Sequence, residues 1–216
     1  MHLPDGLIPA PVCIGGYAIT GLTTWYSLRQ INRQPDPAAE LPKASLLTAA
    51  FFVASLIHIP IPPASVHLIL NGLVGTVLGY YAFPAILIGL VFQAIVFSHG
   101  GFTTLGVNAA MMGIPAILAY HIFYLRHRLG RWTNSRWSTG LFAFIAGAGG
   151  LGLSTLIFLG LTITLIPAEV DAVLERRAIF GLALAHLPLM AIEGAFTTML
   201  VLFLLRVKPE LLRLQE

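Results

Sequence analysis

Charged residues and cysteine are both scarce in this chain of 216 residues, and each shortage excludes classes of protein. Asp, Glu, Lys and Arg make up 10% of the sequence, whereas soluble domains carry about 25%. The single cysteine, Cys13, excludes a disulfide framework, a cysteine-based zinc site and an iron–sulfur cluster. The net charge of +3 does not indicate nucleic-acid binding. With 57% hydrophobic residues and a mean hydropathy of +0.85, the composition indicates a polytopic membrane protein.

Common catalytic and targeting motifs are also absent from the sequence. It holds no HExxH, GxSxG or Walker A pattern, so nothing indicates a metalloprotease, a serine hydrolase or an ATPase. The first residues lack the basic region and the small-residue cleavage pattern of a signal peptide. We expect Met1 to start the mature chain with a free amine, because initiator methionine is usually removed only before small residues and residue 2 is histidine.

Seven apolar segments follow one another, each near the roughly 20 residues that span a bilayer as a helix. They cover residues 9–28, 44–60, 65–81, 83–98, 104–125, 138–166 and 178–205. Gly75 and Gly79 form a small-xxx-small pair that favours close helix packing, and the GAGGLG stretch predicts a tilt or break within 138–166. We therefore expect an all-α fold of seven transmembrane helices, forming one integral membrane domain over residues 1–216.

The basic residues predict the orientation. Most of the 12 Lys and Arg residues fall in three regions: Arg29, Arg33 and Lys43; Arg126, Arg128, Arg131 and Arg136; and Arg206, Lys208 and Arg213. By the positive-inside rule these regions face the cytoplasm. Seven spans then place the N-terminus outside and the C-terminus in the cytoplasm. The Met1-His2 tip and the connections at 58–64 and 98–104 share the external face.

The chain begins MHLPDG, which places an imidazole next to the terminal amine. The Met1 amine, the His2 amide nitrogen and the His2 imidazole can close a five-membered and a six-membered chelate ring around one metal ion. One further nitrogen completes a square, the geometry that suits Ni(II) or Cu(II). The alternative is a surface histidine without function.

Two further motifs place polar groups near the external face. In PASVHLILNG, His67 is expected to begin a membrane helix, with Asn71 one turn below on the same face. His67 is the candidate fourth ligand, or else a helix-start histidine that reaches the headgroups. In FSHGGFTTLGVN, His99 and Asn108 flank a tight turn that could orient a ligating imidazole. The alternative there is ordinary turn and capping chemistry.

The motif HLPLMAIEG predicts that His186, Met190 and Glu193 share one face of a helix kinked at Pro188. A carboxylate within a membrane span is costly and marks a functional position by default. Glu193 is two turns from His186, about 10 Å on a regular helix, so the two cannot pair directly. We favour a structural polar contact for Glu193 over a role in a transport path.

Together the motifs MHLPDG, SVHLILNGLVG, SHGGFTTLGVN and HLPLMAIEG resemble the cobalt/nickel substrate-binding (S) component of energy-coupling-factor transporters, the CbiM/NikM family. The resemblance spans almost the whole chain. It implies seven spans in a prokaryotic plasma membrane and an N-terminal tip that folds back into the bundle. It also implies a square-planar Ni²⁺ or Co²⁺ site formed by the Met1 amine, the His2 amide and imidazole nitrogens, and the His67 imidazole. From their motifs we expect Asn71, His99 and Asn108 to lie beside these ligands.

The resemblance further implies that the protein is not an enzyme. The metal is its transported substrate, and no organic cofactor is expected. The implied partners are a transmembrane T component of the EcfT/CbiQ/NikQ type, ATPase subunits of the CbiO/NikO type and a small CbiN/NikN-like membrane subunit. Two departures from the family pattern stand out: Pro63-Ala64 replaces Gly-Thr, and Ser98 replaces a glycine. The alternatives are a stand-alone divalent metal channel, a membrane metalloenzyme using His99, Asn108 and Glu193, and a structural scaffold.

Overall fold

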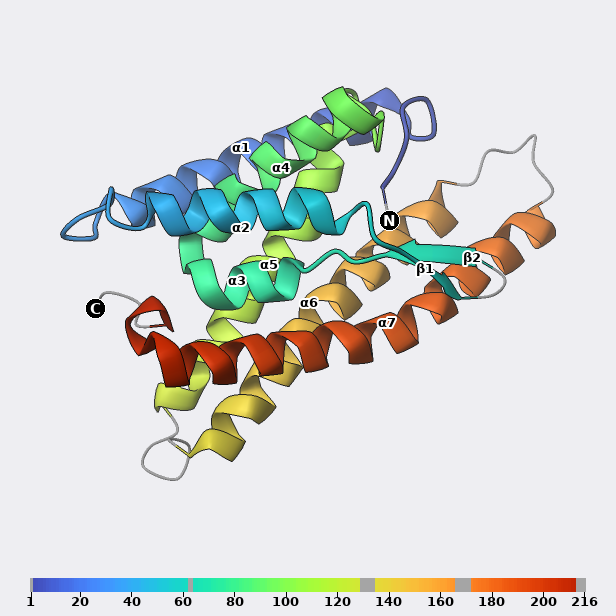
Figure 1. The fold of residues 1–216 in the computed structure, drawn as a ribbon. Coiled ribbons are helices and arrows are strands. Elements are labelled where there is room, and N and C mark those ends of the chain that lie inside the picture. The colour runs from blue at the N-terminus through green and yellow to red at the C-terminus, as the bar shows by residue number, and fades with distance from the viewer. Residues whose placement is uncertain (1, 62–63, 129–134, 166–171, 213–216) are drawn as a thin grey trace.

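The computed structural model describes residues 2–61, 64–128, 135–165 and 172–212, which are mainly helical (Figure 1). In chain order the elements are α1 (Ala10–Ile31), α2 (Leu41–Ala54), β1 (His58–Ile61), β2 (Ala64–His67), α3 (Asn71–Leu78), η1 (Gly79–Tyr81), α4 (Ala82–Phe97), α5 (Leu105–Arg128), α6 (Arg136–Thr164), α7 (Ala172–Val207) and η3 (Pro209–Leu212). Apart from the β1–β2 hairpin, the described residues therefore follow the expected all-α class.

Four helical stretches of the described chain are long and apolar enough to cross a membrane. These are Asn71–Phe97, Leu105–His127, Arg136–Thr164 and Arg177–Val207, while Leu41–Ala54 is apolar but shorter. Helices suit this environment because they pair their own backbone groups where no water is available. The helix α6 runs unbroken through the GAGGLG stretch, and α7 continues through Pro188.

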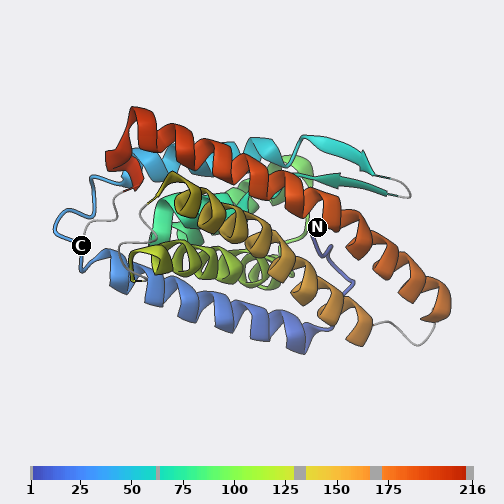
Figure 2. The same cartoon turned by 90° about the horizontal axis from the view of Figure 1, so that it is seen from below.

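The helices pack in two layers. Figure 2 shows α7, α6, α5 and α1 side by side in that order, and these neighbours contact one another in sequence. The shorter helices α2, α3 and α4 lie behind them, with α3 packed against both α5 and α6 and α4 packed against α5. The close approach of α1 to α5 includes a hydrogen bond of 2.6 Å from Thr20 Oγ1 to the Gly106 carbonyl.

The two ends of the bundle differ in what they carry. Figure 1 shows the α1–α2 connection, η1 and the last described residues near one end, where Lys43 Nζ also donates a 3.0 Å hydrogen bond to the Leu211 carbonyl. The N-terminal segment, the β1–β2 hairpin and the α4–α5 connection lie toward the other end. The segments predicted to be external are therefore close together, which is what a shared site requires.

The expected helical start at His67 is wrong. His67 instead ends the antiparallel strand β2, where its backbone pairs with that of His58 in β1. The chain stays non-helical until Asn71 because Leu70 adopts a left-handed conformation, with φ 58°. Such a conformation costs a non-glycine residue about 1–3 kcal/mol, so the surrounding structure must hold it.

Glycines allow α3 to approach its neighbours at backbone distance. A methyl group added at Gly75 would overlap the Ala116 carbonyl in α5 and lie 2.9 Å from its Cα atom. Gly79, the other half of the predicted pair, ends α3 with φ 58°. The two glycines therefore have different functions: Gly75 provides contact, and Gly79 allows the chain to turn into η1 and α4.

We expect Gly75→Ala to destabilise the fold by about 1–3 kcal/mol, because the added methyl meets backbone rather than a flexible side chain. The matched control is Gly149→Ala in α6, where nothing lies within 4 Å of the added Cβ. Thermal unfolding in detergent measures both, and the control should match the parent or exceed it slightly. Equal losses in the two variants would contradict the packing argument.

Candidate metal centre

The chain start is fixed inside the bundle by hydrogen bonds to the backbone of Leu3, whose side chain is buried. The Leu3 amide donates to Asn108 Oδ1 at 2.9 Å, and the Leu3 carbonyl accepts from Asn108 Nδ2 at 3.1 Å. The Thr104 hydroxyl donates to the same carbonyl at 2.6 Å. These groups on α5 and the turn before it satisfy both polar groups of Leu3, so the neighbouring His2 is held in place.

A second attachment is made by Asp5, whose carboxylate binds the turn that precedes α5. It accepts from the amide of Phe102 at 3.1 Å, and from the amide and hydroxyl of Thr103 at 3.0 Å and 2.5 Å. These bonds, led by that from the Thr103 hydroxyl, lower the pKa of Asp5 below its ordinary value. Gly101 makes the approach possible, since a Cβ there would overlap the carboxylate.

The His2 imidazole points toward α4, where Nε2 lies 2.8 Å from Gln93 Oε1. An amide oxygen can only accept, so this contact assigns the proton to Nε2 and leaves the lone pair on Nδ1. Burial, together with the nearby imidazoles of His67 and His99, lowers the pKa of His2 well below its ordinary value. His2 is therefore a neutral ring with Nδ1 available as a metal ligand.

Three imidazoles gather at this point with their planes nearly parallel. The centroid of the His2 ring lies 5.1 Å from that of His67 and 5.7 Å from that of His99, and the last two are 6.2 Å apart. His67 Nδ1 lies 3.1 Å from the Leu68 carbonyl, which can only accept, so the proton is on Nδ1 and the lone pair of the ring is on Nε2. A metal ion about 2 Å from one nitrogen of each ring can join His2 and His67.

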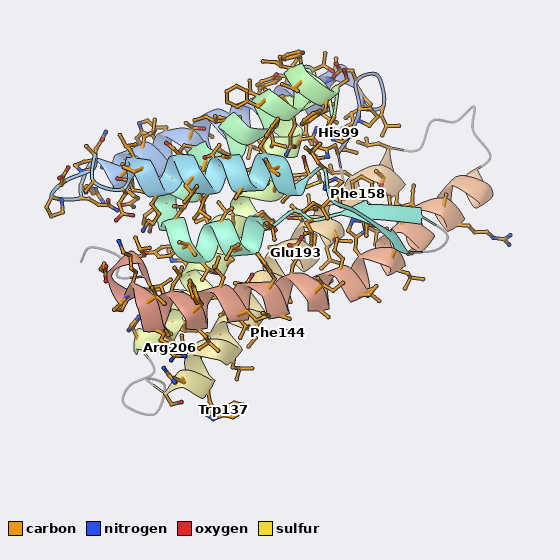
Figure 3. The ribbon with its side chains drawn as sticks, in the orientation of Figure 1. His99, Trp137, Phe144, Phe158, Glu193 and Arg206 are labelled. Carbon is orange, nitrogen blue, oxygen red and sulfur yellow. The ribbon has the colours of Figure 1, made fainter. Side chains whose placement is uncertain are left out.

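His99 is placed by a turn with two left-handed residues, Ser98 at φ 52° and Gly100 at φ 78°. Figure 3 shows His99 near the end where α4 leads toward α5. Ser98 follows α4 in a left-handed conformation, which glycine would adopt without steric cost. The other departure from the family pattern is Pro63-Ala64. Residues 62–63 lie outside the described residues, and Ala64 begins β2.

The predicted site residues divide into two groups. The structure brings together His2, His67, His99 and Asn108, while Met1 lies outside the described residues. Asn71 is instead fully buried among α5 and α6, where its Nδ2 donates to the Met112 and Gly150 carbonyls and to Ser154. Asn71 therefore organises helix packing.

Sequence reasoning missed Gln93, which lies in the predicted 83–98 span and fixes the tautomer of His2. A lone amide in an otherwise apolar helix was the signal that could have found it. In the described chain no three His, Cys, Asp or Glu side chains are arranged to hold a metal ion.

The fold and this arrangement define a membrane protein whose N-terminal backbone is built into a candidate metal centre. Residues 2–211 match the family model described as "Cobalt uptake substrate-specific transmembrane region". The chain belongs to this family, the CbiM family of cobalt/nickel transport proteins.

Several relatives align over nearly the whole chain. A putative metal transport protein from Haemophilus influenzae is 32% identical and covers 100% of this chain and 98% of its own length. A fused nickel transport protein NikMN from Rhodobacter capsulatus is 31% identical over 98% of this chain and 64% of itself. A putative fused cobalt transport protein CbiMQ from Methanocorpusculum labreanum is 29% identical over 98% of this chain and 36% of itself.

The fold also has a relative of known structure. A crystal structure of a truncated transition metal transporter superimposes with a TM-score of 0.75 and covers 96% of this chain and 99% of its own. At 23% sequence identity this likeness concerns the fold alone.

We expect Gly101→Ala to displace Asp5 and loosen the N-terminal segment, which faster hydrogen exchange at the Leu3 amide would report. In a background of Asp5→Ala, the Gly101→Ala change should add little, because the overlapping carboxylate is gone. The stability that the Asp5 carboxylate gives to the N-terminal segment should be fully present above the ordinary pKa of Asp. It should be lost as the pH falls through the lowered pKa of Asp5 in the folded protein. An unchanged effect of Gly101→Ala without the carboxylate would contradict this assignment.

Proposed function

We propose that the chain is the substrate-binding S component of an energy-coupling-factor importer, which captures Ni²⁺ or Co²⁺ at the external face. The observation that carries this proposal is the hydrogen bonding of the first residues. Leu3 has both backbone groups bound and His2 has Nε2 bound to Gln93, whereas no described residue accepts a hydrogen bond from the His2 amide. The His2 amide nitrogen and Nδ1 are thus the donors left for a metal.

The proposed ligands are the Met1 amine, the His2 amide nitrogen, His2 Nδ1 and His67 Nε2. The first three form fused five-membered and six-membered chelate rings in one plane, and His67 supplies the fourth corner. Four nitrogens in a plane suit Ni(II) and Cu(II) and disfavour Zn(II), which prefers a tetrahedron. His99 and Asn108 support this centre, His99 through its packed ring and Asn108 through Leu3.

We further propose seven passes, with the N-terminus outside and the C-terminus in the cytoplasm. The 22 residues of α1 extend about 33 Å at 1.5 Å per residue, enough for a span. The stretch Asn71–Phe97 is divided by the turn at Gly79. The extended residues before α3 together with the eight residues of α3 therefore form one crossing, and α4 forms the next. Basic residues of the α1–α2 connection, the start of α6 and the C-terminal region then lie on one side, as the positive-inside rule requires.

The proposed partners supply the energy, since the sequence contains no Walker A motif. Relatives named as CbiMQ and NikMN fusions support a T component of the CbiQ type and a small NikN-like subunit. ATPase subunits of the CbiO/NikO type complete the proposed importer, in a prokaryotic plasma membrane. Capture by this chain is then a binding step, and ATP hydrolysis in the partners drives uptake.

Adding two glycines before Met1 should abolish high-affinity Ni²⁺ binding, because it moves the terminal amine out of the chelate. Two are needed because a single glycine would place the histidine third, where the new amine, two amide nitrogens and the imidazole form another square-planar site. Isothermal titration of the purified protein with Ni²⁺ measures the effect, and the same two residues added at the C-terminus are the control. Unchanged affinity in the N-terminally extended protein would contradict the proposal. The N-terminally extended protein keeps every side chain of the parent, so a change in Ni²⁺ affinity reports on the position of the terminal amine alone.

Binding should release protons in a number that depends on pH. At pH about 7.5 the His2 amide loses one proton, and the amine, with an ordinary pKa of about 7.7–8.0, adds a fraction of another. His2 adds none, because its lowered pKa keeps the ring neutral. Titration in buffers of different ionisation enthalpy should therefore give more than one proton near pH about 7.5 and about one above the amine pKa. Release of no proton at the higher pH would exclude the amide as a ligand.

A further inference from the structure

One peptide group connects the candidate ligand His67 to a buried carboxylate on α7. The carbonyl of Leu68 lies 3.1 Å from His67 Nδ1 and accepts its proton. The other end of the same peptide unit, the Ile69 amide, donates to Glu193 Oε1 at 2.5 Å. The contacts therefore run without interruption from the carboxylate through one peptide bond to the imidazole.

The second oxygen of Glu193 holds the next peptide. Oε2 accepts from the Leu70 amide at 3.0 Å, which is the residue in the left-handed conformation. Glu193 is 1% exposed, and Figure 3 shows it between α7 and the connection from β2 to α3. A carboxylate with both oxygens on neighbouring amides fixes the orientation of both peptide planes.

The strand side of His67 is fixed as well. The Leu68 amide donates to the Ile57 carbonyl at 3.4 Å, and β1 pairs with β2 up to His67. Without Glu193, however, the Ile69 and Leu70 amides would be buried without partners. The conformation that presents the His67 ring toward His2 thus depends on α7.

We propose that Glu193 is a positioning residue for metal binding, acting on His67 through the Leu68–Ile69 peptide group. This inference depends on the proposed function, in which His67 is a ligand. The carboxylate orients the Leu68 carbonyl and polarises the peptide, which strengthens the hydrogen bond to Nδ1 and makes Nε2 a better donor to the metal. Through Glu193, the α7 helix thereby controls the orientation of His67, the proposed fourth ligand.

The test is a double-mutant cycle of Glu193→Gln and His67→Ala, read by isothermal titration with Ni²⁺. Glutamine keeps the size of the side chain but offers one acceptor oxygen in place of two. In the parent we expect Glu193→Gln to weaken Ni²⁺ binding at least about tenfold and to shift the ligand-field absorption band of bound Ni²⁺. In the His67→Ala background it should change neither, because the residue through which it acts is gone.

Thr197→Val, one turn further along α7, is the matched control. Thr197 is also fully buried, and the described residues offer its hydroxyl no hydrogen-bond partner, so Ni²⁺ affinity should remain that of the parent. Thermal unfolding without metal is recorded for every variant, to separate loss of fold from loss of affinity.

The outcomes distinguish the two proposals. If His67→Ala leaves Ni²⁺ affinity unchanged, the proposed ligand set fails. If His67→Ala weakens binding but Glu193→Gln weakens it equally with or without His67, Glu193 has only a structural role and this inference fails.

A measurement on the unsubstituted protein covers the case in which Glu193→Gln does not fold. Square-planar Ni²⁺ is diamagnetic, so the amide resonances can be compared with and without the ion. The Ile69 amide proton should shift on loading more than that of Leu70, because only the Leu68–Ile69 peptide touches the ring. Equal or absent shifts would overturn the proposed coupling.

Discussion

The hydrogen bonds that hold the backbone of Leu3 are the constraint on which the rest of the candidate site depends. A chain terminus is usually the least ordered part of a protein, and ordering one residue costs about 1–2 kcal/mol. Asn108 and Thr104 offset that cost by binding both polar groups of Leu3 inside the bundle. Only with Leu3 fixed can its neighbour His2 face Gln93 and His67.

Hydrogen bonds from polar side chains to the backbone also explain the non-helical segment near His67. A helix through residues 65–81 would satisfy its own amides but would not leave the extended segment that carries His67. The structure replaces those internal bonds with strand pairing on one side and the Glu193 carboxylate on the other. Non-helical backbone is tolerated at membrane depth only where protein satisfies it. Both halves of the site therefore use polar side chains to hold irregular backbone.

Much of this could be read from the sequence, because apolar runs and motifs are strong signals in a membrane protein. The spans at 104–125 and 178–205 correspond to α5 and α7, and the ring centroids of His2, His67 and His99 lie between 5.1 and 6.2 Å from one another. The β1–β2 hairpin was not predicted, since hydropathy cannot distinguish an apolar strand from a helix. The roles of Gln93 and Glu193 depend on partners in other segments, with Glu193 acting more than 120 residues away from Ile69. No local pattern encodes such pairs.

The central claim is that one metal ion binds nitrogen atoms of the first two residues and of His67. Diffraction from metal-loaded crystals, with anomalous scattering measured across the Ni and Co absorption edges, tests it directly. We expect one strong anomalous peak between His2 Nδ1 and His67 Nε2, coplanar with the Met1 amine and the His2 amide nitrogen. A peak elsewhere in the molecule, or one whose ligands are three imidazoles and water, would contradict it.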